Sequence, residues 1–307
     1  MTGNGQDYDE ILYVPTPGLG VGRVRCAACR PSKAATASKE EPLPLVLVLQ
    51  GGGFVLGQPE DGQKHDRRIS DELGVVVISV DYAKSPRYPY PHALLQIYGV
   101  LKWALSDQAK AHGLHVDPSR VAVMGNSAGG NLTAALSLLL SFKEGPNKRF
   151  REELPQTFEH RLQVLLYPSV DVGIPYGDRF RRSTPEVQAQ SLPVAVAELM
   201  EDSYLPPYVD RHHILIRPLE AGSALLSSLK PPAALVLTAG MDCLKQEADT
   251  YSDLLREAGV KVDAHDYPLA KHGFSHYTKG QDFRPDDVED CWKRIQGALE
   301  SSLELSP

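Results

Sequence analysis

The stretch of sequence that decides the fold is Val121-Ala-Val-Met-Gly-Asn-Ser-Ala-Gly-Gly-Asn-Leu-Thr-Ala-Ala-Leu136. It opens with an apolar run typical of a buried strand, passes through the Gly-x-Ser-x-Gly pentapeptide 125–129, and continues at helical spacing. A serine flanked by small residues at a strand-to-helix turn is the pattern of a nucleophile elbow. We therefore expect Ser127 at the end of a strand, with a helix N-terminus behind it. The alternative is a glycine-rich turn in which the serine only caps the helix.

Apolar runs and helical patterns alternate on both sides of this stretch. The predicted strands cover 24–30, 43–50, 75–82, 120–125, 162–167, 233–240 and 261–267. The predicted helices cover 92–111, 128–142, 246–258 and 286–303. Several strand patterns are continuously apolar, as in parallel strands that are buried on both faces. The sequence thus predicts an α/β fold with a mostly parallel central sheet and helices on both faces.

The chain length of 307 residues is compatible with a single α/β domain that carries an inserted segment. Residues 171–217 lie between two predicted strands and contain apolar positions of their own. A segment of this length is too long for a simple crossover, so we expect it to form a small helical cap.

The charge balance and hydropathy exclude several function classes. The net charge is −7, whereas nucleic acids and anionic membranes attract clustered Lys and Arg. No apolar run approaches the eighteen or so residues of a membrane span, and Met1–Glu10 is polar and acidic, unlike a signal peptide. We expect a cytoplasmic protein with no nucleic-acid partner and no membrane span.

The four cysteines do not suggest a disulfide scaffold in a chain of this length. Cys26-Ala-Ala-Cys29 matches a CxxC pattern, which fits a redox pair, half a zinc site or two buried thiols of a strand. No second pair with ligand spacing follows, and residues three apart in a strand point to opposite faces. We favour buried thiols, and expect no metal.

A serine hydroxyl needs a base, and the base needs an orienting acid. Asp242 follows the predicted strand 233–240, and His272 follows the predicted strand 261–267. Because parallel strands open on the same edge of a sheet, both side chains are expected near Ser127. His276 is the rival base. We favour His272 because it comes first after the strand and a Gly-Phe pair follows it.

Gln50-Gly-Gly-Gly-Phe54 directly follows another predicted strand. Its backbone N–H groups, together with that of Ala128, are suited to bind the oxyanion of a tetrahedral intermediate. A phosphate-binding loop is the alternative, but no Lys or Ser/Thr follows at P-loop spacing and no helical pattern starts there.

From about residue 23 to about residue 277 the chain resembles the hormone-sensitive-lipase branch of the α/β-hydrolase superfamily, which includes many carboxylesterases. The family motifs HGGG, GDSAGG, D-x-L-x-x-E and HGF correspond to residues 50–53, 125–130, 242–247 and 272–274. The resemblance implies that Ser127 is the nucleophile, Asp242 the orienting acid and His272 the general base. It also implies that the oxyanion donors are Gly52, Gly53 and Ala128.

Family members carry a cap over the carboxyl edge of the sheet, which implies that about residues 1–20 join 171–217 in forming it. Three positions depart from the family pattern. Gln50 replaces the histidine that braces the glycine loop, and Asn126 replaces the elbow aspartate. In segment 81–91, Ala83 and Arg87 stand where the family has Arg and Glu.

These features predict a serine hydrolase that cleaves a carboxylic ester, lactone or thioester of a small, largely apolar substrate. No metal and no organic cofactor is expected, since neither a HExxH zinc motif nor a G-x-G-x-x-G at a strand-to-helix turn occurs. One alternative uses the same pocket for a cyclase, isomerase or acyl transferase of specialised metabolism. Another is a non-catalytic binding protein. The oligomeric state stays open, and a homodimer is among the possibilities.

Overall fold

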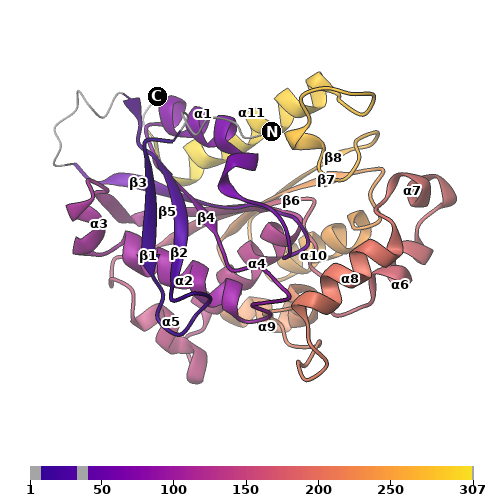
Figure 1. The fold of residues 1–307 in the computed structure, drawn as a ribbon, viewed down its shortest axis with the longest axis horizontal. Coiled ribbons are helices and arrows are strands. Elements are labelled where there is room, and N and C mark those ends of the chain that lie inside the picture. Colours follow the sequence, from indigo (N-terminus) through magenta and orange to yellow (C-terminus); the bar gives the residue numbers. More distant parts are fainter. Residues whose placement is uncertain (1–7, 33–40, 306–307) are drawn as a thin grey trace.

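An eight-stranded sheet forms the centre of the structure, a computed structural model that describes residues 8–32 and 41–305 (Figure 1). The strands are β1 (Glu10–Pro15), β2 (Arg23–Cys29), β3 (Leu43–Leu49), β4 (Val76–Asp81), β5 (Val116–Asn126), β6 (His160–Leu166), β7 (Ala233–Ala239) and β8 (Val262–Tyr267). Their order is β1-β2-β4-β3-β5-β6-β7-β8. β2 pairs antiparallel with β1 and β4, and the other neighbours are parallel. The predicted α/β architecture is confirmed.

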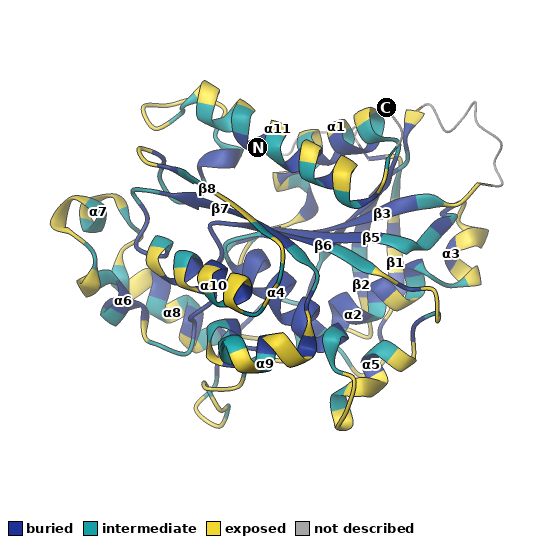
Figure 2. Ribbon diagram, turned by 180° about the vertical axis from the view of Figure 1, so that it is seen from behind, coloured by how far each residue is buried: buried dark blue, intermediate teal, exposed yellow. Residues whose placement is uncertain are grey.

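Helices cover both faces of this sheet (Figures 1 and 2). One face carries α1 (Gln63–Leu73) and α11 (Pro285–Ser302). The other carries α2 (His92–Ala104), α4 (Ala128–Ser141), α9 (Gly222–Leu229) and α10 (Lys245–Glu257). The remaining α-helices are α3 (Asp107–Ala111), α5 (Arg149–Glu152), α6 (Tyr176–Arg182), α7 (Pro185–Gln190) and α8 (Val194–Tyr204). Short 3₁₀ helices span Pro59–Asp61, Pro146–Lys148, Pro218–Ala221 and Phe274–His276.

The continuous apolar run of β3 follows from its position in the middle of the sheet. Leu45, Leu47 and Leu49 pack into the apolar cluster on the α2/α4 side. Val46 and Val48 pack into the cluster on the α1/α11 side. Because successive side chains of a strand point to opposite faces, a strand covered on both faces needs apolar residues at every position.

Helix α4, which follows Ser127, is buried along almost its whole length. Every residue from Ala128 to Leu140 is buried, against β5, β6 and α2. A helix that is buried on all sides is held by packing on all sides. Its N-terminus therefore has a fixed position directly behind Ser127.

Several elements differ from the sequence expectations, and helices α5 and α9, for example, were not among the predicted helices. Strand β1 was not predicted. Its exposed residues Ile11 and Tyr13 are apolar, like its buried residues Leu12 and Val14. The sequence therefore lacks the alternation of apolar and polar residues that marks an edge strand with one buried face. Helix α1 was not predicted either. It buries the polar side chains of Asp66 and Ser70 beside Ile69, so its sequence has few apolar residues at helical spacing. The single helix expected over 92–111 is broken into α2 and α3.

Helices α6, α7 and α8, all within segment 171–217, lie together at one end of the sheet (Figure 1). About residues 1–20 were expected to join segment 171–217 in a cap. Residues 10–15 form the edge strand β1, because their backbone pairs with β2 over its whole length, and residues 1–7 lie outside the described residues. Among residues 8–32 and 41–305, no helix has the length and apolar character needed to cross a membrane.

Candidate active site

Ser127 lies at the junction between β5 and α4, with φ 54° and ψ −120°. A positive φ is uncommon for a residue with a side chain and costs on the order of 1–3 kcal/mol. The flanking glycines make the turn possible. A Cβ on Gly125 would collide with the Gly129 carbonyl, and a Cβ on Gly129 would collide with the Leu49 carbonyl of β3. The tight turn therefore presents the Ser127 hydroxyl at the carboxyl edge of the sheet.

Two hydrogen bonds join the three side chains that sequence reasoning selected. His272 Nε2 lies 2.9 Å from Ser127 Oγ, and His272 Nδ1 lies 2.6 Å from Asp242 Oδ2. Asp242 follows β7 and His272 follows β8, so the parallel sheet delivers both to the edge where Ser127 lies. The arrangement can take a proton from the hydroxyl and stabilise the imidazolium that results.

Further hydrogen bonds fix the positions of Asp242 and His272. The Leu244 N–H donates to Asp242 Oδ1 at 3.1 Å, and Asp242 is only 4% exposed. The Tyr277 hydroxyl donates to the backbone carbonyl of His272 at 2.9 Å. Burial lowers the pKa of His272, but the charge and hydrogen bond of Asp242, together with the charge of Glu247, outweigh burial, and the net shift of this pKa is upward. The imidazole is thus a stronger base than it would be without Asp242.

His276, the rival base, lies away from the serine. Its Nδ1 is 3.1 Å from Tyr167 Oη and 2.9 Å from Ser275 Oγ, and its ring packs against Trp292. Burial lowers the pKa of His276 to about 4. The structure therefore brings His272, and not His276, into contact with Ser127 Oγ.

The glycine loop after β3 lies beside the elbow because β3 and β5 are neighbours in the sheet. The N–H groups of Gly52, Gly53 and Ala128 make no intramolecular hydrogen bond within the described parts of the chain. All three residues line the same cavity as Ser127 and His272. Free backbone donors around a nucleophile are what an oxyanion hole requires.

Hydrogen bonds between side chains and the backbone hold this loop in its conformation. Gly52 and Gly53 have φ 124° and 59°, which residues with side chains rarely adopt. The Tyr82 hydroxyl donates to the Gln50 carbonyl at 2.7 Å, and the Gly51 N–H donates to Asn126 Oδ1 at 3.0 Å. Asn126, which departs from the family's aspartate, therefore connects the elbow directly to the glycine loop.

The other departures from the family pattern also have visible consequences. Gln50 is buried, and its amide packs against the backbone of Gly62, where there is no room for a Cβ. Segment 81–88 is held by Asp81, which forms ion pairs with Lys84 at 3.0 Å and Arg25 at 3.7 Å. Arg25 is also paired with Glu60.

The cavity above Ser127 has a volume of about 300 Å³. Apart from the reacting groups, its walls are mainly aromatic and aliphatic, and include Phe54, Tyr167, Tyr176, Leu192, Ala197, Met200 and Leu244. Tyr176, Leu192, Ala197 and Met200 come from segment 171–217. A cavity of this size and character accommodates a small apolar group.

A buried charge network ties segment 171–217 to the acid loop, and sequence reasoning missed it. Arg179 of α6 is 4% exposed and pairs with Glu201 of α8 and, at 3.0 Å, with Glu247 of α10. Glu247 also accepts hydrogen bonds from the Val170 and Asp171 N–H groups at 2.9 and 3.2 Å. Glu247 was recognisable as the end of the acid-loop motif, but its arginine partner has no sequence signal.

The CxxC pair is not a ligand pair. The side chain of Cys26 packs into the apolar cluster on one face of the sheet, and that of Cys29 into the cluster on the other. Burial raises the pKa of the Cys29 thiol to about 12 and that of Cys26 further still. Within residues 8–32 and 41–305, no group of three or more His, Cys, Asp or Glu side chains is placed to hold a metal ion.

Comparisons with known proteins identify relatives of this chain. A family model described as alpha/beta hydrolase fold matches residues 46–276. The carboxylesterase NlhH of Mycobacterium tuberculosis is 32% identical over 238 residues, covering 76% of this chain and 67% of that protein. An arylesterase of Saccharolobus solfataricus is 29% identical over 262 residues, covering 83% and 78%. Among solved structures, an esterase of Pyrobaculum calidifontis has a TM-score of 0.75 and 30% identity, over 97% of this chain and 86% of that one.

Proposed function

This chain belongs to the α/β-hydrolase-fold family and is a carboxylic ester hydrolase, and we propose that it cleaves esters, lactones or thioesters of small, largely apolar substrates through an acyl-enzyme on Ser127. The observation that supports this most strongly is the chain of hydrogen bonds from Asp242 through His272 to Ser127, at 2.6 and 2.9 Å, inside an apolar cavity.

The proposed reaction has two halves. Ser127 Oγ attacks the carbonyl carbon while His272 Nε2 takes the hydroxyl proton, and the N–H groups of Gly52, Gly53 and Ala128 bind the oxyanion. The intermediate collapses, and His272 returns the proton to the leaving alcohol or thiol. Water then gives a proton to His272 and attacks the acyl-enzyme. The acid leaves, and Ser127 recovers its proton.

We propose that segment 171–217 acts as a cap that shapes the acyl or alcohol pocket of a single hydrolase domain. Phe54, next to the glycine loop, stacks on Tyr204 of α8 with ring centroids 3.7 Å apart. The Cys243 N–H, beside the acid, donates to Ser191 Oγ at 3.2 Å. These contacts support a cap that lies against two parts of the proposed catalytic machinery.

The experiment is a series of nitrophenyl esters, from acetate to long acyl chains, given to the wild-type protein and to Met200→Ala. Met200 lines the cavity and lies against Gly53. We expect the wild type to prefer short chains, and Met200→Ala to shift the optimum of kcat/KM to longer ones, because the cavity widens. The matched control is Leu199→Ala, which removes an exposed side chain of the same helix. An optimum at long chains in the wild type would contradict the proposed substrate class.

The relatives reported above are named as esterases, and they do not favour the alternative of a cyclase, isomerase or acyl transferase in the same pocket. A cytoplasmic location is part of the proposal. It is supported by the free buried thiols of Cys26, Cys243 and Cys291, which fit a reducing compartment. Cell fractionation tests the location, and light scattering tests whether the chain forms a homodimer.

A further inference from the structure

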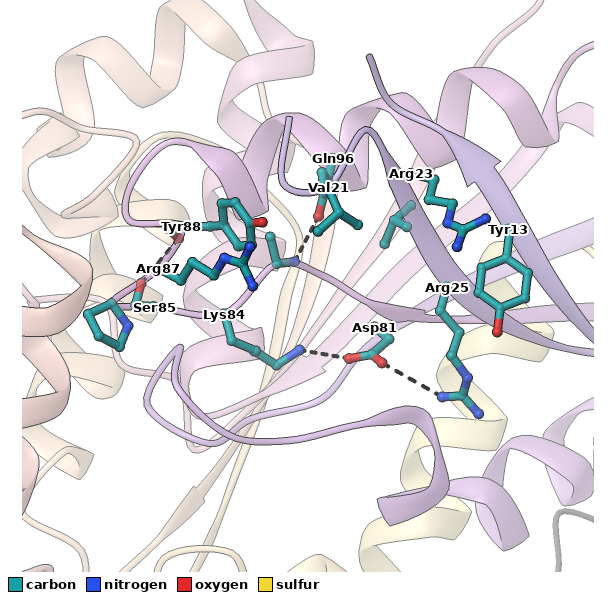
Figure 3. A pocket seen from close by; sticks show the side chains of 13 residues that line it. Tyr13, Val21, Arg23, Arg25, Asp81, Lys84, Ser85, Arg87, Tyr88 and Gln96 are labelled. Carbon is teal, nitrogen blue, oxygen red and sulfur yellow. Dashed lines mark hydrogen bonds and ion pairs between the residues drawn. The ribbon is translucent and has the colours of Figure 1, made fainter. Parts of the chain in front are cut away.

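A second hollow, of about 750 Å³, lies between the turn that joins β1 to β2 and the segment that follows β4 (Figure 3). It shares no lining residue with the Ser127 cavity. It is nevertheless close to the glycine loop, because the Ser85 N–H donates to the carbonyl of Phe54 at 3.0 Å. The hollow is thus separate from the proposed active site but built partly on a segment that contacts it.

The lining of this hollow is strongly cationic, although the chain as a whole has a net charge of −7. Four cations, Arg23, Arg25, Lys84 and Arg87, line it, and Asp81 is the single carboxylate of the lining. Asp81 pairs with Lys84 and Arg25, as the dashed lines that end on Asp81 in Figure 3 show, and Arg25 also pairs with Glu60. Among the described residues, the charges of Arg23 and Arg87 are therefore the uncompensated ones of this lining. The local charge therefore favours an anionic ligand.

Two of these cations are without an acidic partner. Neither Arg23 nor Arg87 forms an ion pair with any carboxylate in residues 8–32 or 41–305. Each contacts an aromatic ring instead: Arg23 Cζ lies 5.1 Å from the centre of the Tyr13 ring, and Arg87 Cζ lies 5.3 Å from that of Tyr88. A cation–π contact positions a guanidinium without neutralising its charge, so both groups keep their donors for a ligand.

The same walls offer apolar surface. Tyr13 is 58% exposed and Val21 is 65% exposed, so both offer apolar surface to a ligand. Figure 3 shows Tyr13 and Tyr88 towards opposite ends of the hollow, with the row of Lys84, Asp81 and Arg25 below. A ligand that fits both features combines a negative group with a flat apolar body.

The walls are held in place before any ligand binds. The Ala83 N–H donates to Gln96 Oε1 at 2.7 Å, and Gln96 Nε2 donates to Thr16 Oγ1 at 3.2 Å and to the Leu19 carbonyl at 3.3 Å. Gln96 therefore links the β1–β2 turn to the segment after β4. Preformed walls reduce the ordering cost of binding.

We propose that this hollow is an accessory binding site for a small anion with an aromatic or similarly flat apolar body, such as an aryl carboxylate, sulfonate or phosphate. The cations attract the negative group, and the tyrosines and Val21 contact the body. Such a site is independent of the chemistry proposed at Ser127.

The test uses naphthalene-2-sulfonate as the probe, titrated into the full chain by isothermal calorimetry at low salt. Naphthalene-2-sulfonamide is the uncharged control ligand, because an apolar cavity such as that above Ser127 accepts both. The variant is R23Q/R87Q. The control variant R68Q/R256Q removes two other half-exposed arginines and changes the net charge equally.

We expect saturable binding of the sulfonate by the wild type, and little binding of the sulfonamide. R23Q/R87Q is expected to raise the Kd at least about tenfold, and R68Q/R256Q less than about twofold. Raising the salt from about 20 to about 200 mM is expected to weaken binding, because exposed charges are screened. Equal binding of the two ligands, equal weakening in the two variants, or no saturable binding by the wild type would overturn the proposal.

Discussion

The side-chain oxygen of Asn126 accepts a hydrogen bond from the Gly51 N–H at 3.0 Å, so the residue before Ser127 braces the loop that carries two of the proposed oxyanion donors. The position of this loop relative to Ser127 is thus set by a contact between adjacent strand ends, β3 and β5. Small displacements of such donors lower the catalytic rate, because the donors must point at the charge that develops in the transition state.

The first prediction concerns this brace. Asn126→Ala leaves the Gly51 N–H without its partner, and we expect kcat to fall roughly tenfold, the equivalent of about 1.4 kcal/mol. Asn126→Asp keeps an acceptor at the same place and is expected to stay within about twofold of the wild type. Steady-state kinetics with a short-chain nitrophenyl ester measures both, and circular dichroism checks the fold. Equal activity of Asn126→Ala and the wild type would show that the loop holds its shape without this bond.

The second prediction concerns pH. The proposed mechanism needs neutral His272, so kcat/KM falls as the pH drops through the pKa of this residue. Asp242 raises that pKa, whereas burial alone lowers it. In Asp242→Asn the acid limb therefore moves to lower pH, while kcat drops by about four orders of magnitude because the imidazole loses its orienting partner.

The matched control for this change is Asp263→Asn, which removes an exposed carboxylate on β8. Its pH–rate profile is expected to coincide with that of the wild type. An acid limb that stays in place or moves to higher pH in Asp242→Asn would contradict the assigned direction of the His272 pKa shift.

The third prediction concerns Arg179, the buried arginine of the proposed cap. Arg179→Met leaves the carboxylates of Glu201 and Glu247 buried without their cation, and we expect the free energy of unfolding to fall by about 3–5 kcal/mol. Arg181→Met, on the same helix, removes a side chain that is 70% exposed and is expected to cost no more than about 1 kcal/mol. Urea unfolding compares the two variants. Similar midpoints for both would mean that the network does not hold the cap to the acid loop.

Much of the site could be predicted from the sequence, because the alternation of strand and helix patterns indicates a parallel sheet. Ser127, Asp242 and His272 each follow a predicted strand, and parallel strands bring such positions to one edge. The structure places these three side chains in hydrogen-bond contact. The glycine loop was readable for the same reason, since it follows β3.

Other features depend on contacts that no local pattern encodes. Arg179 sits in a segment rich in charges, and nothing in its neighbours marks it as buried. Its role depends on how α6 and α8 fold over α10. The brace from Asn126 to Gly51 joins residues 75 positions apart and depends on the pairing of β3 with β5. The cationic hollow likewise combines the β1–β2 turn with segment 81–88, and β1 itself was hidden by apolar residues on both faces.

The most direct test of the central claim is turnover of a short-chain nitrophenyl ester by the wild type and by Ser127→Ala. The substitution removes one hydroxyl and leaves the backbone turn in place, so the fold should persist, which circular dichroism checks. The account predicts measurable wild-type hydrolysis and a loss of kcat on the order of 10⁶-fold in Ser127→Ala. Turnover retained by a folded Ser127→Ala protein would contradict the assignment of Ser127 as the nucleophile.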